Sequence, residues 1–274
     1  MRPIRNLLLI VVLFAWNGCR SPMSSPWVEV DKGLFVGEFN APGMLIATKP
    51  RITIIKIDPS YFDFHLLSTS EKKHDPLTTA QWCQKYNLLG AINAGMYQID
   101  LKTHAGYMKN FSHVNNPSLN AYHSVLAFNP IDDCLASIRL FDLDETEWKE
   151  IFQSYHTVIQ NLRLIKNPGE NRWEPQSKRW NEAALGQDTD GNILFIYSAS
   201  SLTMHQLNSL LLQLPINLGS AQHLEGGPPA SLYFSHQGIT LLRNAAIKNQ
   251  DLSTAAKEGI PIPNVIGFTK RSAQ

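Results

Sequence analysis

Two short segments combine a hydrogen-bonding side chain with glycine directly after apolar residues that are typical of a strand. They are residues 93–97 (NAGMY), which begin with Asn93, and residues 224–229 (LEGGPP), which contain Glu225. Glycine lets a ligand approach the backbone closely, and ligands of sheet proteins often lie beyond the ends of strands. The pattern predicts that both segments contribute to one pocket. The alternative is two tight turns in which Asn93 and Glu225 only bond nearby amides.

A helix is expected before each of these strands. Asp75-Pro76 is typical of a helix start, because Asp is a favoured N-cap and Pro fits the first helical position. Residues 77–87 then carry apolar side chains at helical spacing, and residues 90–93 follow as a short buried strand. Thr203 can cap a second helix with an apolar face, and residues 221–225 follow as a strand. In such a strand His223 lies on the same face as Glu225.

Other segments predict further strands and one further helix. Residues 52–57 and 62–66 are expected to form a hairpin across Asp58-Pro59-Ser60. The remaining expected elements are a strand pair at 124–128 and 135–141, a helix at 144–155, and strands at 192–197 and 231–234. Residues 27–270 contain no repeat of fixed period and no low-complexity linker. We therefore predict one α+β domain with a mixed β-sheet and a few packed helices.

Composition excludes several classes of protein. The 274 residues are 43% hydrophobic and 17% charged, which is typical of a globular chain and not of a disordered one. Lys and Arg number 24 against 23 Asp and Glu, so the net charge is +1. We expect no nucleic-acid partner, because such binding depends on clustered basic charge. No apolar run reaches the roughly 18 residues of an ordinary membrane-spanning helix.

The first 19 residues are typical of an export signal. Arg2 and Arg5 form a basic start, and an apolar block runs over residues 7–16. Asn17-Gly18-Cys19 is similar to a bacterial lipobox, although Trp16 stands where an aliphatic residue is usual. We expect an exported protein, periplasmic or anchored to the membrane by a lipid on Cys19, with a tether and lead-in segment at 20–49 and the main domain at 50–270.

The other two cysteines leave two alternatives open. In an oxidising compartment Cys83 and Cys134 can form a disulfide, but the sequence does not place them close together. The alternative is a pair of buried free thiols, which the apolar helical face around Cys83 favours.

Five segments together resemble the phosphodiester glycosidase family, and they occur in the family's order over roughly residues 50–268. They are INAGMY (92–97), AGYMKN (105–110), IQNLRLI (159–165), ALGQDTDGNILFIYS (184–198) and HLEGGPPASLYF (223–234). The order and spacing of these segments carry the resemblance. It implies a hydrolase that cleaves the glycosidic C–O bond of a sugar-1-phosphodiester in an envelope or extracellular glycan.

The chain departs from the family pattern at three places. Glu225 stands where the family usually has Asp. The family arginine before the Ala-x-Gly of the 184–198 segment is absent, and Arg179 is the nearest arginine in sequence. Pro228-Pro229 replaces a more glycine-rich continuation. These changes favour, as an alternative, an envelope lipoprotein that binds glycans without cleaving them. A lipoprotein that only docks another envelope protein is a third possibility.

The resemblance implies roles for individual residues. Cleavage at the anomeric carbon passes through an oxocarbenium-like transition state, which a carboxylate stabilises. Glu225 is expected in that role, and His223 is expected to tune it or to donate a proton, unless it is a hydrogen-bonded strand histidine. Asn93 is expected to orient the substrate, and Asp188 is a rival carboxylate unless it belongs to a plain surface turn. The expected substrate-binding residues are Gly95, Tyr97, Gly106, Arg179, and Gly226 with Gly227, whose backbone N–H groups are expected to bind phosphate. The histidines of the 103–123 loop are expected to be mostly solvated. We expect no cofactor and assign no metal-binding residues, and the sequence leaves the binding of a divalent cation open.

Overall fold

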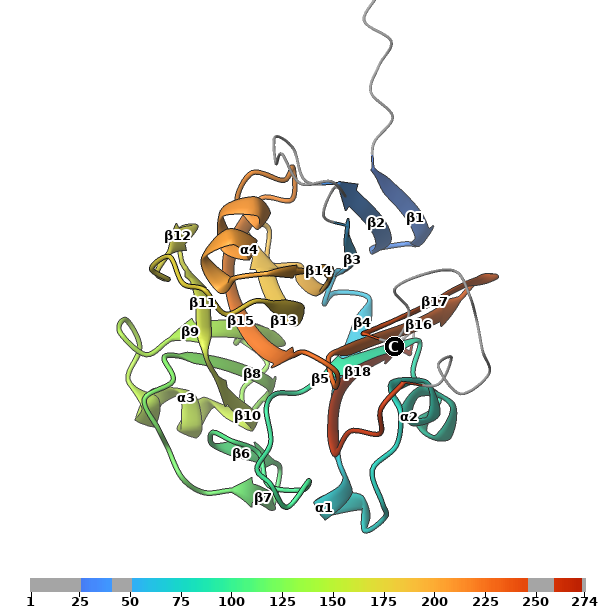
Figure 1. Ribbon diagram of the computed structural model, residues 1–274. Helices are drawn as coiled ribbons and strands as arrows, with labels where there is room; N and C mark the ends of the chain where they lie inside the picture. The colour runs from blue at the N-terminus through green and yellow to red at the C-terminus, as the bar shows by residue number, and fades with distance from the viewer. Residues whose placement is uncertain (1–25, 41–50, 246–258, 273–274) are drawn as a thin grey trace, which may run out of the picture.

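Antiparallel strands form most of the fold in the computed structural model, which describes residues 26–40, 51–245 and 259–272 (Figure 1). Every named pair of strands is antiparallel, so the predicted mixed sheet is wrong. The predicted export signal and Cys19 lie outside the described residues.

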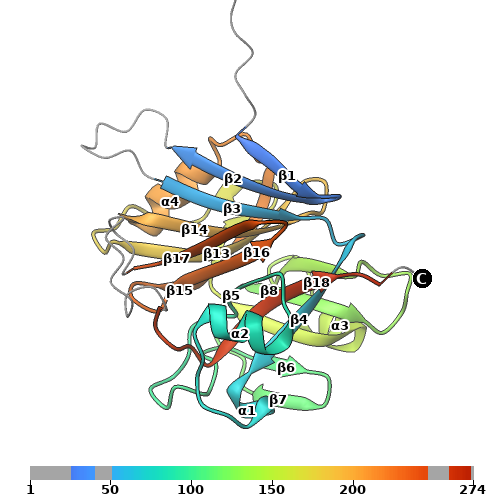
Figure 2. The same cartoon turned by 90° about the vertical axis from the view of Figure 1, so that its right-hand side faces the viewer.

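The strands belong to three sheets. The eight-stranded sheet has the order β1 (Trp27–Asp31), β2 (Leu34–Asn40), β3 (Arg51–Ile57), β14 (Ile193–Leu202), β13 (Trp180–Asp188), β15 (Leu218–Gly226), β11 (Arg163–Lys166), β12 (Glu170–Asn171). One five-stranded sheet has the order β7 (His113–Asn116), β6 (Met108–Asn110), β10 (Tyr155–Asn161), β8 (Ser124–Pro130), β9 (Ile138–Asp142). The other has the order β17 (Ile239–Asn244), β16 (Ser231–His236), β5 (Gly90–Asn93), β18 (Asn264–Lys270), β4 (Phe62–Ser68). Figure 2 shows β1, β2 and β3 on one side of the molecule and β6 and β7 on the opposite side.

Each sheet has one helix packed on one of its faces. Helix α4 (Met204–Leu211) lies on the eight-stranded sheet, α2 (Thr79–Tyr86) on the sheet that contains β5, and α3 (Trp148–Ser154) on the sheet that contains β8. A short fourth helix, α1 (Thr69–Lys72), follows β4. Each of the three packed helices encloses an apolar cluster of its own against its sheet, so helices cover sheet faces that would otherwise be exposed to water.

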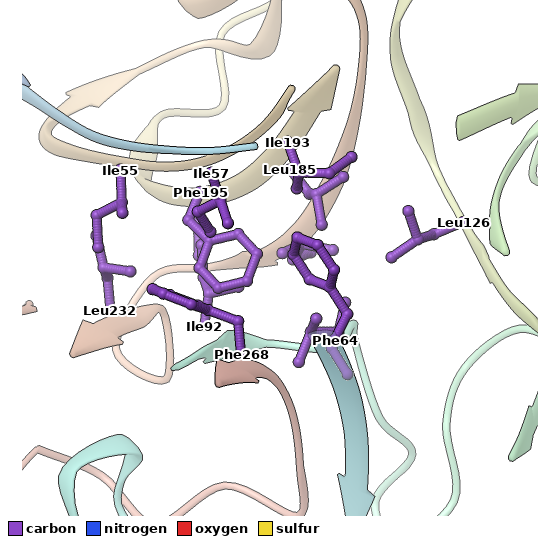
Figure 3. Close-up of a cluster of buried hydrophobic side chains, with 14 of the residues drawn as sticks. Ile55, Ile57, Phe64, Ile92, Leu126, Leu185, Ile193, Phe195, Leu232 and Phe268 are labelled. Carbon is purple, nitrogen blue, oxygen red and sulfur yellow. The ribbon is translucent and has the colours of Figure 1, made fainter. Parts of the chain in front are cut away.

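The main core lies where the three sheets meet. Figure 3 shows Phe195 of β14 close to Phe268 of β18 and Ile92 of β5, and Leu126 of β8 approaches from the third sheet. Phe195 and Phe268 pack edge to face with ring centroids 5.7 Å apart. Because this cluster takes side chains from every sheet, it joins the three sheets through one apolar core.

The first described strand is joined to the sheet that contains the last one. The Asp31 carboxylate accepts hydrogen bonds from Lys270 Nζ at 2.7 Å and from His236 Nε2 at 3.0 Å. These partners hold the pKa of Asp31 well below its ordinary value. Strands β1 and β2 fall within the predicted lead-in segment 20–49 and pair into the eight-stranded sheet.

Most predicted elements are confirmed, with two differences. The α2 helix begins after Thr78, not at Asp75, because the Thr78 hydroxyl accepts the Gln81 N–H while the Gln81 side chain accepts the Thr78 N–H. Strands β3 and β4 do not form the predicted hairpin. Strand β3 is buried on both faces and pairs with β2 and β14, whereas β4 pairs with β18 in another sheet.

Candidate active site

The two glycine-bearing segments meet. Asn93, at the end of β5, donates from Nδ2 to the Pro229 carbonyl at 3.1 Å, and its Oδ1 accepts the Ser231 N–H at 2.8 Å. The second loop therefore lies directly against the end of β5, and Figure 1 shows β15 ending beside that strand. The two segments are therefore in contact, and the pocket expected from them stays a prediction.

Asn93 itself holds the loop in position. Its side chain is 1% exposed, and both of its polar ends bond to backbone atoms of the loop. In this geometry Asn93 positions residues 229–231, and no free polar group of its side chain faces solvent. The direct substrate contact expected from the sequence has no support here.

Glu225 is the half-buried carboxylate at the meeting point. One of its oxygens accepts the N–H of Gly226 at 3.0 Å. Burial raises the pKa of Glu225 above its ordinary value, and nearby Glu182 adds to the rise. The pKa of Tyr97 is also raised, by its own burial and by the negative charge of Glu225. Tyr97 from the first loop and Glu225 from the second are therefore electrostatic neighbours, as a shared site requires.

A buried ion pair lies behind Glu225, and its acidic member was not predicted. The Oε1 atom of Glu182 bonds to His223 Nδ1, and its Oε2 atom accepts the indole N–H of Trp180 at 2.5 Å. The two side chains of the pair are 3% and 4% exposed. Burial acts to lower the pKa of His223, but the carboxylate of Glu182 outweighs it, and the pKa is raised overall.

A β-bulge lies between His223 of this pair and Glu225. Ala184 of β13 is opposite His223, whereas the adjacent Ala183 is opposite Glu225, so Leu224 is the extra residue on β15. Neighbouring residues of β13 point to opposite faces, so the expectation that His223 and Glu225 share one face of the strand is wrong. Leu224 is fully buried in the main core. The negative charge of Glu225 nevertheless adds a small contribution to the raised pKa of His223.

Gly95 of the first loop is enclosed by two buried polar side chains. Its φ is +155°, and a Cβ atom there would overlap His104 Nε2 and Asn161 Oδ1. His104 is fully buried, and burial lowers its pKa to about 4. The expectation that this histidine is solvated is wrong. Gly106 is similarly enclosed, since a Cβ there would lie 2.6 Å from the Gln160 carbonyl oxygen.

The backbone N–H groups of the second loop are already used. Gly226 N–H bonds to Glu225, and Gly227 N–H donates to the Asn181 carbonyl at 3.0 Å. Gly227 has a φ of +76°, so glycine allows the turn there. The two glycines shape the loop, and their N–H groups are not free for phosphate as expected from the sequence.

Two other predicted site residues lie elsewhere. Asp188 is at the opposite end of β13, where its carboxylate accepts the N–H groups of Asp190 and Asn192 at 3.0 and 2.8 Å. Asp188 therefore belongs to a turn, which was the alternative to a role as a catalytic carboxylate. Arg179 bonds to Gln206 of α4 at 2.6 Å. The structure therefore does not bring either residue to Glu225.

The structure also describes the two cysteines of the main domain, the acidic and histidine side chains that could bind a metal, and the lengths of the helices. Cys83 is a buried free thiol and Cys134 an exposed one, so the two do not pair. Within residues 26–40, 51–245 and 259–272, no group of three or more His, Cys, Asp or Glu side chains is placed to hold a metal ion. No helix of this described part is long and apolar enough to span a membrane.

Comparison with known proteins matches the chain to one family. A family model described as phosphodiester glycosidase matches residues 86–269, which include both glycine-bearing segments, Glu182 and His223. The comparison with curated proteins gave no match.

Solved structures share the fold. The catalytic domain of zebrafish N-acetylglucosamine-1-phosphodiester alpha-N-acetylglucosaminidase, auto-inhibited by its pro-peptide, superposes with a TM-score of 0.62 at 13% identity, covering 87% of this chain and 82% of that one. A hypothetical protein from Synechocystis gives a TM-score of 0.61 at 11% identity, covering 89% of this chain. The present chain spans 63% of the Synechocystis chain.

Proposed function

The chain belongs to the phosphodiester glycosidase family, and on that premise we propose that it hydrolyses the glycosidic C–O bond of a sugar-1-phosphodiester. The observation that carries the proposal is the half-buried Glu225, which lies where the two glycine-bearing loops meet and beside Tyr97. The zebrafish protein with the same fold is named for action on such a diester.

Glu225 can serve this reaction in its ionised form, which is present above its raised pKa. Positive charge develops at the anomeric carbon in the transition state, and an ionised carboxylate beside that carbon stabilises it. The departing phosphate has a second pKa of about 6, so it leaves with less help from an acid than a sugar alcohol needs. Tyr97 supplies an aromatic face against which a sugar ring can pack.

The test is release of reducing sugar from methyl phosphodiesters of glucose, galactose and N-acetylglucosamine. We expect the wild-type chain to hydrolyse at least one of them and Glu225→Gln to lower kcat/KM at least about 100-fold, which is the usual scale for a positioned carboxylate. Glu29→Gln is the matched control, because Glu29 is exposed on β1, and it should leave the rate unchanged.

Two results would count against the proposal. Equal rates for wild type and Glu225→Gln would remove Glu225 from the reaction. Calorimetric binding of these diesters or of glycan fragments with no release of sugar would instead favour the glycan-binding alternative.

We also propose that the chain is exported and acts on an envelope or extracellular glycan. The support is the basic start at Arg2 and Arg5, the apolar block that follows, and the Gly18-Cys19 sequence. If Cys19 carries lipid, Cys19→Ser should move the protein from the membrane fraction to the soluble fraction of the producing cells. An unchanged distribution would contradict lipid anchoring.

A further inference from the structure

We propose that His223, held by Glu182, is the cationic group that binds the phosphoryl group of the substrate through its Nε2–H. The inference rests on the proposed function and adds to it a residue for phosphate recognition and leaving-group departure.

The first support is the geometry of the pair. Glu182 lies on β13 directly opposite Gly226, so its carboxylate is at the level of the second glycine loop. It bonds to His223 Nδ1 and is itself held by the Trp180 indole. The imidazole ring is thereby fixed by one nitrogen. Within residues 26–40, 51–245 and 259–272 its other nitrogen, Nε2, makes no hydrogen bond, and we assign that nitrogen as the donor to the substrate.

The second support is that the other expected phosphate ligands are engaged elsewhere. Arg179 is bonded to α4, and the N–H groups of Gly226 and Gly227 are bonded within the protein. A phosphodiester is an anion, and its recognition requires a cation or free donors. His223 is a basic side chain near Glu225, and its raised pKa favours the cationic form.

The third support is the set of charges that face the imidazole. Glu182 on β13 contacts the imidazole, and Glu225 on β15 acts on it electrostatically. Tyr97 is a further titratable side chain, and it interacts with Glu225. Both carboxylates raise the pKa of His223 against the effect of burial. The imidazolium form is present below that raised pKa and is lost as the pH rises through it. A site built this way binds phosphate in a pH-dependent manner, unlike one built on arginine.

The proposed step conserves atoms and electrons. The C1–O bond breaks, and both of its electrons go to the phosphoryl oxygen, which takes the proton of His223 Nε2. Glu225 remains ionised and stabilises the cationic sugar. Water adds its hydroxyl to C1, and its remaining proton passes through Glu225 and returns to the imidazole. The products are a reducing sugar and a phosphate monoester, and the protein is unchanged.

The kinetic test compares two substrates that share a sugar. One is the methyl phosphodiester that the wild type hydrolyses, and the other is the p-nitrophenyl glycoside, whose leaving group is not a phosphate. His223→Gln should lower kcat/KM for the phosphodiester about 100-fold, and the loss for the aryl glycoside should be at least about tenfold smaller, because its leaving group carries no phosphoryl group. Equal losses on both substrates would overturn the proposal, since they indicate a general structural effect.

The second test needs no turnover. Titration of the His223 ring by NMR should give a pKa above the ordinary value of 6.5 in the wild type, and addition of methyl phosphate should raise it further. Glu182→Gln should lower it by about one unit or more, whereas Glu29→Gln should not change it. If methyl phosphate leaves the His223 resonances and pKa unchanged, the proposal is wrong.

The kinetic test and the NMR titration distinguish the proposed hydrolase activity from the proposed role of His223. A wild type that hydrolyses none of the diesters contradicts the proposed function, while the methyl phosphate titration still decides whether His223 binds phosphate. An active wild type with an unresponsive His223 overturns only the inference about the pair.

Discussion

Replacement of Asn93 by alanine distinguishes a positioning residue from a substrate contact. The change removes two hydrogen bonds between β5 and the loop after β15. The buried Ser231 N–H loses its acceptor, which costs about 1–3 kcal/mol, and the lost bond to the partly exposed Pro229 carbonyl costs about 0.5–1.5 kcal/mol. We therefore expect the free energy of unfolding to fall by about 1.5–4.5 kcal/mol.

Urea unfolding followed by tryptophan fluorescence measures this loss. The same change should lower the Tm by roughly 5–15 °C for a chain of this size. Asn40→Ala is the matched control, because Asn40 is exposed at the end of β2. Its unfolding free energy should stay within about 0.5 kcal/mol of the wild type.

The refuting result is a stable variant without activity. If Asn93→Ala unfolds within about 0.5 kcal/mol of the wild type and yet loses most of its kcat/KM, Asn93 contacts the substrate. The reasoning from its two backbone partners would then be wrong.

Three further predictions concern other parts of the molecule. Gly95→Ala should destabilise the fold by about 1–3 kcal/mol, because its methyl group overlaps the buried His104; a thermal scan unchanged from wild type would contradict this. Asp31→Asn should lower the unfolding free energy at pH 7 and have little effect in strong acid. The pKa of Asp31 is held below its ordinary value of 3.8, so its contribution is complete above that value and is lost as the pH falls through the folded-state pKa; a loss independent of pH would refute it. In a Cys19→Ser chain, a thiol reagent should modify exposed Cys134 at once and Cys83 only on unfolding, because burial raises the pKa of the Cys83 thiol; two rapidly modified thiols would contradict the burial.

Local sequence signals found the elements that carry the two loops. Residues 90–93 and 221–225 could be assigned as strands because each follows a well-marked helix. The Thr203 cap is confirmed in the structure, where Gln206 completes a capping box. These signals involve residues close together in the chain, so neither strand pairing nor sheet order is needed to read them.

The Glu182–His223 pair could not be found in this way. The polar sequence of residues 170–181 is typical of a loop, although β13 begins within it, at Trp180. The pair depends on the register of β13 against β15 and on the bulge at Leu224. Both are set by tertiary packing and leave no pattern within either strand.

The convergence of the loops was predictable, but the role of Asn93 was not. The residue type indicates a hydrogen-bonding site, and only the coordinates show that its partners are backbone atoms some 136 and 138 positions away. The sequence likewise does not show the hydrogen-bond partner of Gly227, whose N–H group donates to a carbonyl on a neighbouring strand.

Glu225 extends from the eight-stranded sheet, whereas Tyr97 follows a strand of another sheet. The site thus lies across the boundary between two sheets. The distance between its two side chains depends on how the two sheets pack against each other along this seam. A small slip along that seam leaves each ladder of backbone hydrogen bonds intact while it separates the acid from the tyrosine. Warming should therefore inactivate this protein before it melts.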